Sequence, residues 1–517
     1  MTGRGRARAD TTVALVERAA RLWPDAEALV DRDVRLTFSQ LNNEVRRVTN
    51  AAMTAGLRPR DRVAIWAPNR WEWVVATLGL HAAGVVIVPL NTRHKGNEAS
   101  YILDRSGARM LFTVERFLGV DFQALLEGHR TPVERTVVFG ATSWDVFLDA
   151  ADEHEPPIVS EDDLSDIIFT SGTTGQPKGV MSTHGQTVRT FRSWCEIIGL
   201  RAGDRYLVAS PFFHTFGYKA GFIGALQGGA TTYPLAVADA AAVLDVVDRE
   251  RITMLPGTPS LFQAIFEHPD LGSFDISSLR LSGVGAASVP VELVERMRTE
   301  LFDTVVTGYG LTESTGVSTM SRPDDPVELI CRTVGRALPG VELRIVDESG
   351  RDVPTGGEGE ILIRGDNVMP GYFDDPARTR QAIDVDGWLH TGDVGTIDAL
   401  GYLSITDRLK DMFIVGGFNV YPAEIEAALL RHADIAAAAV VGMPDPRLGE
   451  VGRAFVVPRA GATPQPEQII AWLRDEIANF KVPRAVEIVG ELPMNAVGKV
   501  VKDELRARPL RSDGRQT

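Results

Sequence analysis

Helix and strand patterns alternate along the chain up to about Met320, and this alternation limits the possible folds more than any other feature of the sequence. The segment from Thr37 to Gly56 has a capping-box spacing at Thr37 and Gln40, apolar residues at helical intervals and a terminal glycine, so it predicts a helix. The stretch RVAIWAPN, residues 62–69, has the short apolar run of a strand. Such alternation predicts an α/β fold of layered subdomains with parallel sheets.

The stretch from Trp73 to Thr92 contains no Asp, Glu, Lys or Arg and is near the length of a membrane span. Gly84 and Pro89 divide it into two shorter apolar parts. We therefore expect a buried helix followed by a buried strand, and no integral membrane segment.

The pattern changes after Val341, where short alternating strands such as VELRIV and EILIRG are separated by turn residues. This change predicts a β-rich subdomain at about residues 341–406, within a large N-terminal domain of residues 1–406. Mixed helix and strand patterns return in residues 407–517, which predicts a small C-terminal α+β domain.

Charge and cysteine content narrow the possible partners. The chain has 54 Lys and Arg against 69 Asp and Glu, a net charge of -15, so we expect no nucleic-acid partner and only local positive pockets for polyanions. Cys195 and Cys331 are the only cysteines, which favours a reducing cytoplasm over a disulfide-bridged secreted fold. The sequence carries no signal for an oligomeric state.

The stretch TSGTTGQPKG, Thr170 to Gly179, combines three glycines, four hydroxyl residues and a lysine, a composition suited to phosphate because backbone N–H groups, hydroxyls and an ammonium can converge on one anion. It is not a Walker loop, because Lys178 is followed by Gly179 where Ser or Thr is needed to reach Mg²⁺. It also lacks the G-x-G-x-x-G of a dinucleotide fold.

This loop instead resembles the phosphate loop of the adenylate-forming superfamily, which includes acyl-CoA synthetases, adenylation domains and firefly-type luciferases. Four further stretches follow in the order and spacing of that family: TGYGLTE (307–313), WLHTGD (388–393), ITDRLKDMFIVGGFNVYPAEIE (405–426) and LPMNAVGKV (492–500). The resemblance covers nearly the whole chain. It implies an ATP-dependent ligase that activates a carboxylic acid as acyl-AMP, releases pyrophosphate and transfers the acyl group to CoA, with ATP and Mg²⁺ as cofactors and CoA as co-substrate.

The resemblance also implies which residues form the ATP site. They are Thr170, Ser171, Gly172, Thr173, Thr174, Gly175 and Lys178 around the pyrophosphate, Gly285, Ala286, Ala287, Gly308, Tyr309 and Gly310 around the adenine, Thr312 at the α-phosphate, and Asp393 and Arg408 at the ribose. Glu313 and Thr174 are implied to hold Mg²⁺, whose hard charge suits oxygen ligands. Two alternatives stay open: the small residues after Gly283 can simply allow close strand packing, and Asp393 and Arg408 can form a structural ion pair.

The resemblance implies a C-terminal domain that rotates between the two half-reactions, and it assigns a role to one lysine near each end of that domain. Lys499 resembles the lysine that contacts both the carboxylate and the α-phosphate during adenylation. Lys410 occupies the hinge position, although it can also be a solvated loop charge, and Gly416, Gly417 and Phe418 would line the tunnel for the pantetheine arm.

The acid is indicated by PFFHTFGYKAG, residues 211–221, which has no carboxylate to pair the ammonium of an amino acid. His214 resembles a residue that borders the acyl pocket, Phe216 lies beside it, and Lys219 is a candidate for contacting a polar group on the acid, although His214 can be a core residue and Lys219 a surface one. The sequence most resembles actinobacterial acyl-CoA synthetases, in particular one that activates a bicyclic propanoate from steroid-ring breakdown. The alternatives are a medium- or long-chain fatty acid, an acyl-AMP ligase that loads a carrier protein, and a non-enzymatic ATP sensor.

Overall fold

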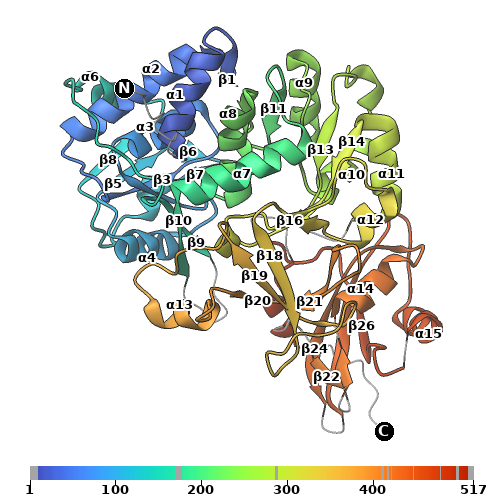
Figure 1. The fold of residues 1–517 in the computed structure, drawn as a ribbon. Helices are drawn as coiled ribbons and strands as arrows, with labels where there is room; N and C mark the ends of the chain where they lie inside the picture. Colours follow the sequence, from blue (N-terminus) through green and yellow to red (C-terminus); the bar gives the residue numbers. More distant parts are fainter. Residues whose placement is uncertain are drawn as a thin grey trace, which may run out of the picture. The chain divides into compact units, whose positions relative to one another are not determined.

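A computed structural model gives the structure of the chain and describes residues 10–170, 177–285, 289–408, 411, 413–415, 418–420, 422–445, 448–477, 479–495 and 500–509 (Figure 1). The contacts divide the chain into two compact units. The larger consists of Met1–Gly285, Val289–Leu343 and Ile363–His390, and the smaller of Ala286–Ser288, Arg344–Leu362 and Thr391–Thr517.

A six-stranded sheet forms the first layer of the larger unit. Its strands, in spatial order, are β10 (Lys178–Thr183), β9 (Leu164–Thr170), β4 (Val86–Pro89), β3 (Arg62–Trp66), β5 (Met110–Thr113) and β8 (Arg135–Val138). All neighbours are parallel except β9 and β10, which are antiparallel. A short connection allows only antiparallel pairing, so the predicted parallel sheet is confirmed in its interior and ends in a hairpin at its edge.

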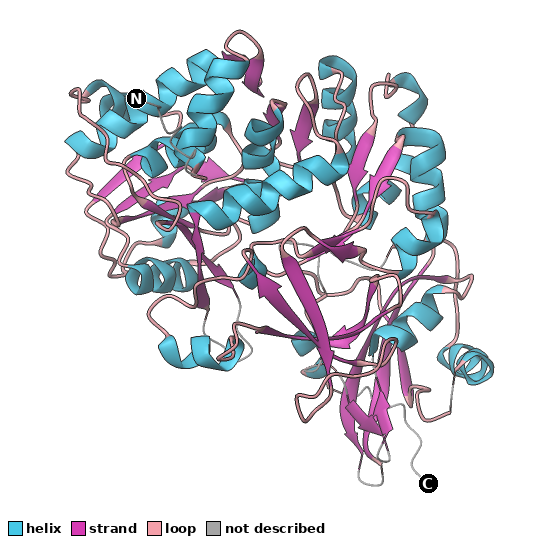
Figure 2. Ribbon diagram, in the orientation of Figure 1, coloured by secondary structure: helices cyan, strands magenta, loops and turns pink. Residues whose placement is uncertain are grey.

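Helices cover this sheet at the predicted positions (Figure 2). The helix expected from Thr37 is α2 (Phe38–Thr54), and Thr37 and Gln40 form the predicted capping box. The expected buried helix and strand are α3 (Trp71–Ala82), buried from Glu72 to its end, and β4. The remaining elements of this layer are α1 (Thr12–Leu22), α4 (Gly96–Ser106), β6 (Arg116–Phe117), β7 (Val120–Asp121), α5 (Phe122–Leu125) and α6 (Thr142–Asp149).

Within the described residues, no helix is both long and apolar enough to cross a bilayer.

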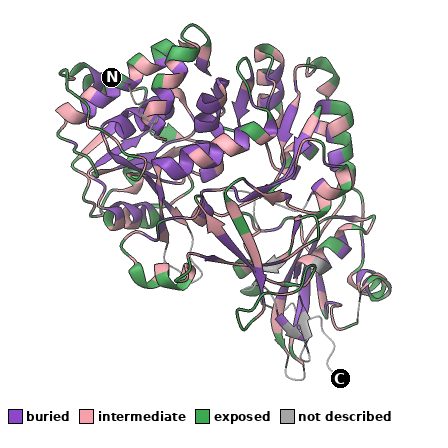
Figure 3. Ribbon diagram, viewed as in Figure 1, coloured by how far each residue is buried: buried purple, intermediate pink, exposed green. Residues whose placement is uncertain are grey.

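A second sheet lies in the same unit. Its strands are β2 (Val34–Thr37), β1 (Glu27–Asp31), β12 (Thr231–Pro234) and β11 (Arg205–Val208), and single bridges through Met254 continue it to β13 (Leu281–Gly283) and β14 (Thr304–Val306). The accompanying helices are α7 (His184–Ile198), the π-helix η1 (Phe216–Ile223), α8 (Gly224–Gly228), α9 (Ala240–Glu250), α10 (Pro259–Phe266), η2 (Leu271–Ser273), α11 (Val291–Arg296), η3 (Met297–Leu301) and α12 (Val327–Arg332). Figure 3 shows the buried residues concentrated on the strands and on the helices beside them.

Short strands follow along the chain. A three-stranded sheet contains β15 (Gly308–Tyr309), β16 (Thr319–Met320) and β17 (Arg336–Ala337). The short helix η4 (Thr312–Ser314) lies between β15 and β16 in the chain. A four-stranded sheet contains β18 (Val341–Val346), β19 (Gly359–Gly365), β20 (Leu389–Ile397) and β21 (Leu403–Arg408), and α13 (Pro376–Ala382) lies between β19 and β20 in the chain. This sheet occupies the stretch predicted to be β-rich, whereas the contacts assign residues from Thr391 onward to the smaller unit, so the predicted boundary at residue 407 stays a prediction.

The last part of the smaller unit is an α+β structure around one apolar core. Its sheet contains β22 (Phe413–Val415), β23 (Phe418–Val420), β24 (Ile435–Asp445), β25 (Gly449–Pro458) and β26 (Ala485–Ile488), and its helices are α14 (Pro422–Leu430), α15 (Pro466–Glu476) and α16 (Lys502–Arg506). Buried Ile425, Leu429, Val440 and Leu473 belong to the core between helices and sheet. The predicted fold class is confirmed.

Candidate active site

The β9–β10 hairpin holds the two ends of the predicted phosphate loop together. Thr170, the last residue of β9, is paired with Lys178, the first residue of β10. The loop residues Ser171, Gly172, Thr173, Thr174 and Gly175 lie outside the described residues. The hairpin therefore fixes where Thr170 and Lys178 stand relative to each other, directly opposite across an antiparallel ladder.

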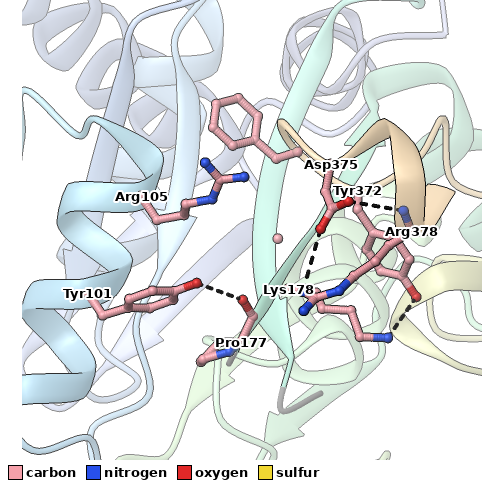
Figure 4. A pocket seen from close by; sticks show the side chains of 9 residues that line it. Tyr101, Arg105, Pro177, Lys178, Tyr372, Asp375 and Arg378 are labelled. Carbon is pink, nitrogen blue, oxygen red and sulfur yellow. Dashed lines mark hydrogen bonds and ion pairs between the residues drawn. The ribbon is translucent and has the colours of Figure 1, made fainter. Parts of the chain in front are cut away.

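A chain of polar contacts leads from Lys178 through Tyr372 to Glu313, and Figure 4 shows its first contact, between Lys178 and Tyr372. The Lys178 Nζ lies 3.4 Å from the Tyr372 Oη and 4.7 Å from the centroid of the Tyr372 ring. The Tyr372 hydroxyl donates a hydrogen bond of 3.0 Å to Glu313 Oε1. Burial, reinforced by the Glu313 charge, raises the pKa of Tyr372, so its hydroxyl stays protonated and able to donate.

Tyr372 reaches this place because its backbone extends the edge of β10. Phe373 N donates to Gly179 O at 2.7 Å and Met181 N donates to Gly371 O at 3.1 Å, so Tyr372 forms an antiparallel bridge with Val180. Tyr372 was not among the sequence-predicted site residues. It lies far from both partners in sequence, and only the added strand brings the three side chains together.

Glu313 lies on η4, in a tight turn with several conformational constraints. Thr315 and Gly316 follow in the left-handed region, with φ of 58° and 95°. Asn367 Nδ2 donates to the carbonyl of Ser314 at 3.3 Å, and Thr315 Oγ1 donates to the carbonyl of Asn367 at 2.7 Å. These buried bonds hold the turn that presents Thr312 and Glu313.

The residues predicted to surround adenine come together in part. Gly308 and Tyr309 form β15, and a Cβ on Gly285 would stand 4.0 Å from the Gly308 carbonyl oxygen, so the two stretches are neighbours. A Cβ on Gly310 would stand 2.5 Å from the Gly316 backbone, which only glycine avoids. Ala286 and Ala287 lie outside the described residues.

The predicted acyl-pocket residues lie at the start of η1. His214 and Phe216 are both half-buried, and the Phe216 ring meets the Trp194 ring edge-on, with centroids 6.1 Å apart. A Cβ on Gly316 would stand 2.5 Å from the Thr215 methyl carbon. The turn after Glu313 therefore packs directly against the predicted acyl motif.

Lys219 is placed differently from the expectation that it contacts the acid or faces solvent. Its side chain is 0% exposed, and its Nζ lies 3.0 Å from Asp166 Oδ1, on β9, whose carboxylate is equally buried. Ser165 Oγ donates to the other oxygen of Asp166 at 2.7 Å. Burial lowers the pKa of Lys219 and the Asp166 charge opposes that shift. The ammonium therefore has a charged partner inside the protein and does not face solvent.

Two buried histidines lie next to this ion pair. Thr12 Oγ1 lies 2.9 Å from Nδ1 of both His81 and His184, and His81 Nε2 lies 3.0 Å from the Ser165 carbonyl oxygen. Because that carbonyl can only accept, His81 carries its proton on Nε2 and accepts from Thr12 on Nδ1. Burial lowers the pKa of His184 to about 4 and that of His81 well below its ordinary value. The network joins α1, α3, α7 and β9 beneath the hairpin.

In the smaller unit, the backbone pairs Asp393 on β20 directly with Arg408 on β21. Asp393 is 3% exposed, and the side chain of Arg408 lies outside what is described. Phe418 begins β23. Lys410, Gly416, Gly417 and Lys499 lie outside the described residues, so their roles stay predictions.

A divalent cation could be held at Glu313. Among the residues that the structure describes, no three His, Cys, Asp or Glu side chains gather as a metal cage. One carboxylate suffices for Mg²⁺ where substrate phosphates and water complete an octahedral shell, so the residues present fit this ion.

Comparison with known proteins gives one consistent result. Residues 16–373 match the AMP-binding enzyme family and residues 424–499 match the AMP-binding enzyme C-terminal domain. A 7a-methyl-1,5-dioxo-octahydro-1H-inden-4-yl propanoyl:CoA ligase of Rhodococcus jostii is 49% identical, with 96% of this chain and 98% of the relative covered, and the protein of the same name from Mycobacterium tuberculosis is 48% identical at the same coverage. Among solved structures, an anthranilate CoA ligase in complex with anthranoyl-AMP is 29% identical with a TM-score of 0.88, and 98% of each chain is covered.

Proposed function

Because the chain belongs to the AMP-binding enzyme family and is an AMP-forming acid–thiol ligase, we propose that the acid it activates is a bicyclic propanoate of the kind that steroid-ring breakdown yields. One observation carries this proposal: two relatives, 49% and 48% identical over 96% of this chain, are both ligases of such a propanoate. The enzyme uses ATP and CoA with this small-molecule acid.

The predicted acyl motif supports an uncharged ring system. Lys219 is the only charged residue in the 211–221 segment, apart from the titratable His214, and its ammonium is matched by Asp166 inside the protein. Within the motif, half-buried Phe216 is an aromatic group that could contact such an acid, and its ring packs edge-on against buried Trp194. A fused hydrocarbon ring binds through such surfaces by burial of apolar area.

In the first half-reaction, an oxygen of the substrate carboxylate bonds to the α-phosphorus of ATP, and the bond between that phosphorus and the bridging oxygen breaks. The electron pair leaves with the pyrophosphate. Lys178 stands at the end of the phosphate loop, where a fixed cation stabilises the charge that develops on the leaving group. Tyr372 orients both Lys178 and the Glu313 carboxylate for this task.

Glu313, with Thr174 as a further candidate, would hold Mg²⁺, which supplies neutralisation of phosphate charge when bound. Thr312 precedes Glu313 on the same helix η4, so both residues are presented by one turn. Gly310 lies so close to the Gly316 backbone that any side chain there would clash, so this turn requires glycine at that position.

In the second half-reaction, the CoA thiolate bonds to the acyl carbon and AMP leaves. We assign Lys499 to the first half-reaction only. Lys499→Ala should lower the rate of acyl-AMP formation by about 10²–10³, because one electrostatic contact to the transition state is lost. Thioester formation from supplied acyl-AMP should remain largely intact; equal loss of both steps would contradict the assignment.

The substrate is tested by measuring pyrophosphate and AMP release with a panel of acids, each with and without CoA. The bicyclic propanoate should give the highest kcat/KM and a thioester product. A medium-chain and a long-chain linear fatty acid and ferulate serve as the comparison acids. Highest kcat/KM with a linear chain would overturn the proposed substrate, and production of ADP with orthophosphate would overturn the reaction itself.

A further inference from the structure

A cavity of about 280 Å³ opens beside the first residues of β10, on the side of Lys178 that faces α4 and α13 (Figure 4). Its lining includes Arg105 from α4, Lys178 from β10 and Arg378 from α13. Asp375 is the one carboxylate in that lining. Three cations against one anion give a local positive site in a chain whose net charge is -15.

The two arginines are held in place but remain accessible to solvent. Arg105 Nη2 donates to the Asp374 carbonyl oxygen at 2.8 Å, and its side chain is 38% exposed. The carboxylate of Asp374 lies 3.5 Å from Arg105 Nη1, and that of Asp375 lies 3.5 Å from Arg378 Nη1. These separations exceed the 2.7–2.9 Å or so of strong charge-assisted hydrogen bonds, so a polyanion can compete for both guanidinium groups.

The position of the cavity connects it to the reaction. Lys178 both lines the cavity and contacts Tyr372, the residue bonded to Glu313. Lys178 can thus contact a polyphosphate both beside Tyr372 and in the cavity. The Tyr101 hydroxyl donates to the Pro177 carbonyl oxygen at 3.4 Å and so ties α4, which carries Arg105, to the end of the phosphate loop.

We propose that this cavity binds the pyrophosphate released in the first half-reaction, with Arg105 and Arg378 as the two guanidinium groups that receive it. The inference rests on the proposed function, because only an AMP-forming ligase produces this anion at Lys178. Guanidinium groups bind phosphate oxygens in a bidentate manner, and two of them on opposite elements suit an anion with two phosphoryl groups. The same site would receive pyrophosphate when acyl-AMP is converted back to ATP, so loss of the two guanidinium groups should weaken pyrophosphate binding in both directions.

The test is ATP–pyrophosphate exchange and product inhibition with the full-length protein and its variants Arg105→Gln, Arg378→Gln and the double variant. The KM for pyrophosphate in exchange, and its inhibition constant in the forward direction, should rise about fivefold in each single variant and more than about tenfold in the double variant. The KM values for ATP and for the acid should stay within about twofold. Arg116→Gln is the matched control, because Arg116 is an exposed arginine beside Asp121 and does not line the cavity.

Direct binding of Mg²⁺–pyrophosphate to nucleotide-free protein, measured by calorimetry, separates this inference from the proposed function. Weakened binding in the double variant supports the site even where no acid has been found. Unchanged binding and unchanged KM for pyrophosphate in a folded double variant overturn it. The double variant could instead show a higher KM for CoA and weaker competition by adenosine 3′,5′-bisphosphate, with no change for pyrophosphate. That result also overturns the inference and assigns the cavity to the CoA nucleotide. Absence of any exchange by the unmodified protein counts against the proposed function instead.

Discussion

The β9–β10 hairpin and the β20–β21 hairpin both place predicted nucleotide contacts opposite each other, yet their surroundings differ. In the first hairpin, Asp166 lies on β9 four residues before Thr170, opposite Ser182, and forms the buried ion pair with Lys219. In the second hairpin, the described contacts next to Asp393 include the 3.1 Å hydrogen bond from Gly392 N to Glu360 Oε1. Strand register alone is enough to place two residues opposite each other in either hairpin. In the β9–β10 hairpin, the buried charge of Asp166 on β9 also links the hairpin to the stability of the fold. Substitutions under the first hairpin should therefore change stability, and those in the second should change nucleotide affinity alone.

The largest effect is expected from Lys219→Met. This change leaves the Asp166 carboxylate buried without a cation, and breaking one side of a buried pair costs about 3–5 kcal/mol of the free energy of unfolding. Unfolding of the larger unit by urea is monitored through tryptophan fluorescence. The double variant Lys219→Met with Asp166→Asn should recover much of the loss, since no uncompensated charge remains.

Arg249→Met is the matched control for this prediction. Arg249 pairs with Asp245 on the surface of α9, with both side chains more than half exposed, so its loss should cost less than about 1 kcal/mol. If Lys219→Met proved no more harmful than this control, the buried pair would not distinguish the two hairpins.

The next effect is a loss of stability in acid. The pKa of His184 is about 4 in the folded protein, below the ordinary value of about 6.5, so the unfolded chain binds the extra proton between these values. The contribution of His184 to the free energy of unfolding is fully present above about pH 6.5. It is lost as the pH drops toward 4, by about 3 kcal/mol in total. His81, whose pKa is also lowered by burial, adds to the loss in the same direction.

His184→Asn removes the titration while keeping a nitrogen donor near the position of Nδ1 for Thr12. The free energy of unfolding should therefore depend less steeply on pH in the variant than in the unmodified protein. Urea midpoints at several pH values between 7.5 and 4.5 give the two slopes. Parallel curves would show that His184 is not a proton-linked part of the support under β9.

The sequence predicted the local parts of this picture well. Capping at Thr37 and Gln40 and the breaks at Gly84 and Pro89 are local signals, and α2, α3 and β4 follow them. The roles of Lys178 and Glu313 come from the family motifs and stay predictions. Pairings between distant segments have no such local signal, so neither the contact of Tyr372 with Glu313 nor the buried ion pair of Lys219 with Asp166 was predicted.

One sequence feature does hint at the burial of Lys219. The lysine is followed by the apolar run AGFIGAL, which forms the rest of η1 and the start of α8. A charge in such a run is almost never buried without a partner. The identity of the partner, Asp166, depends on how β9 passes η1, which periodicity does not specify.

A smaller effect is expected from Tyr372→Phe, which tests the link from the first hairpin to Glu313. The change removes the donor to Glu313 Oε1 but keeps the ring that contacts Lys178. A hydrogen bond to a charged group contributes about 1.5–3 kcal/mol, so kcat/KM for ATP should fall about 10–100-fold. Thioester formation from supplied acyl-AMP should not change.

Tyr233→Phe is the control for Tyr372→Phe. Tyr233 is also buried in the larger unit, and its hydroxyl makes no hydrogen bond in the described structure. Its loss should leave kcat/KM for ATP within about twofold. Equal losses in both variants would indicate a general packing effect and would remove Tyr372 from the orientation of Glu313.

The smallest effect is expected in the second hairpin, from Asp393→Asn. Asn has nearly the same shape as Asp, so the buried position on β20 should tolerate it with little change in the free energy of unfolding. If Asp393 accepts hydrogen bonds from the ribose, the loss of its charge should raise the KM for ATP about tenfold, equivalent to about 1.4 kcal/mol. Asp398→Asn, in the turn of the same hairpin where Asp398 accepts from Leu400 N and Tyr402 N, should leave that KM within about twofold. If Asp393→Asn lowered the free energy of unfolding without changing the KM for ATP, Asp393 would be a structural residue. Only the β9–β10 hairpin would then be proposed to contact the nucleotide through this pair of positions.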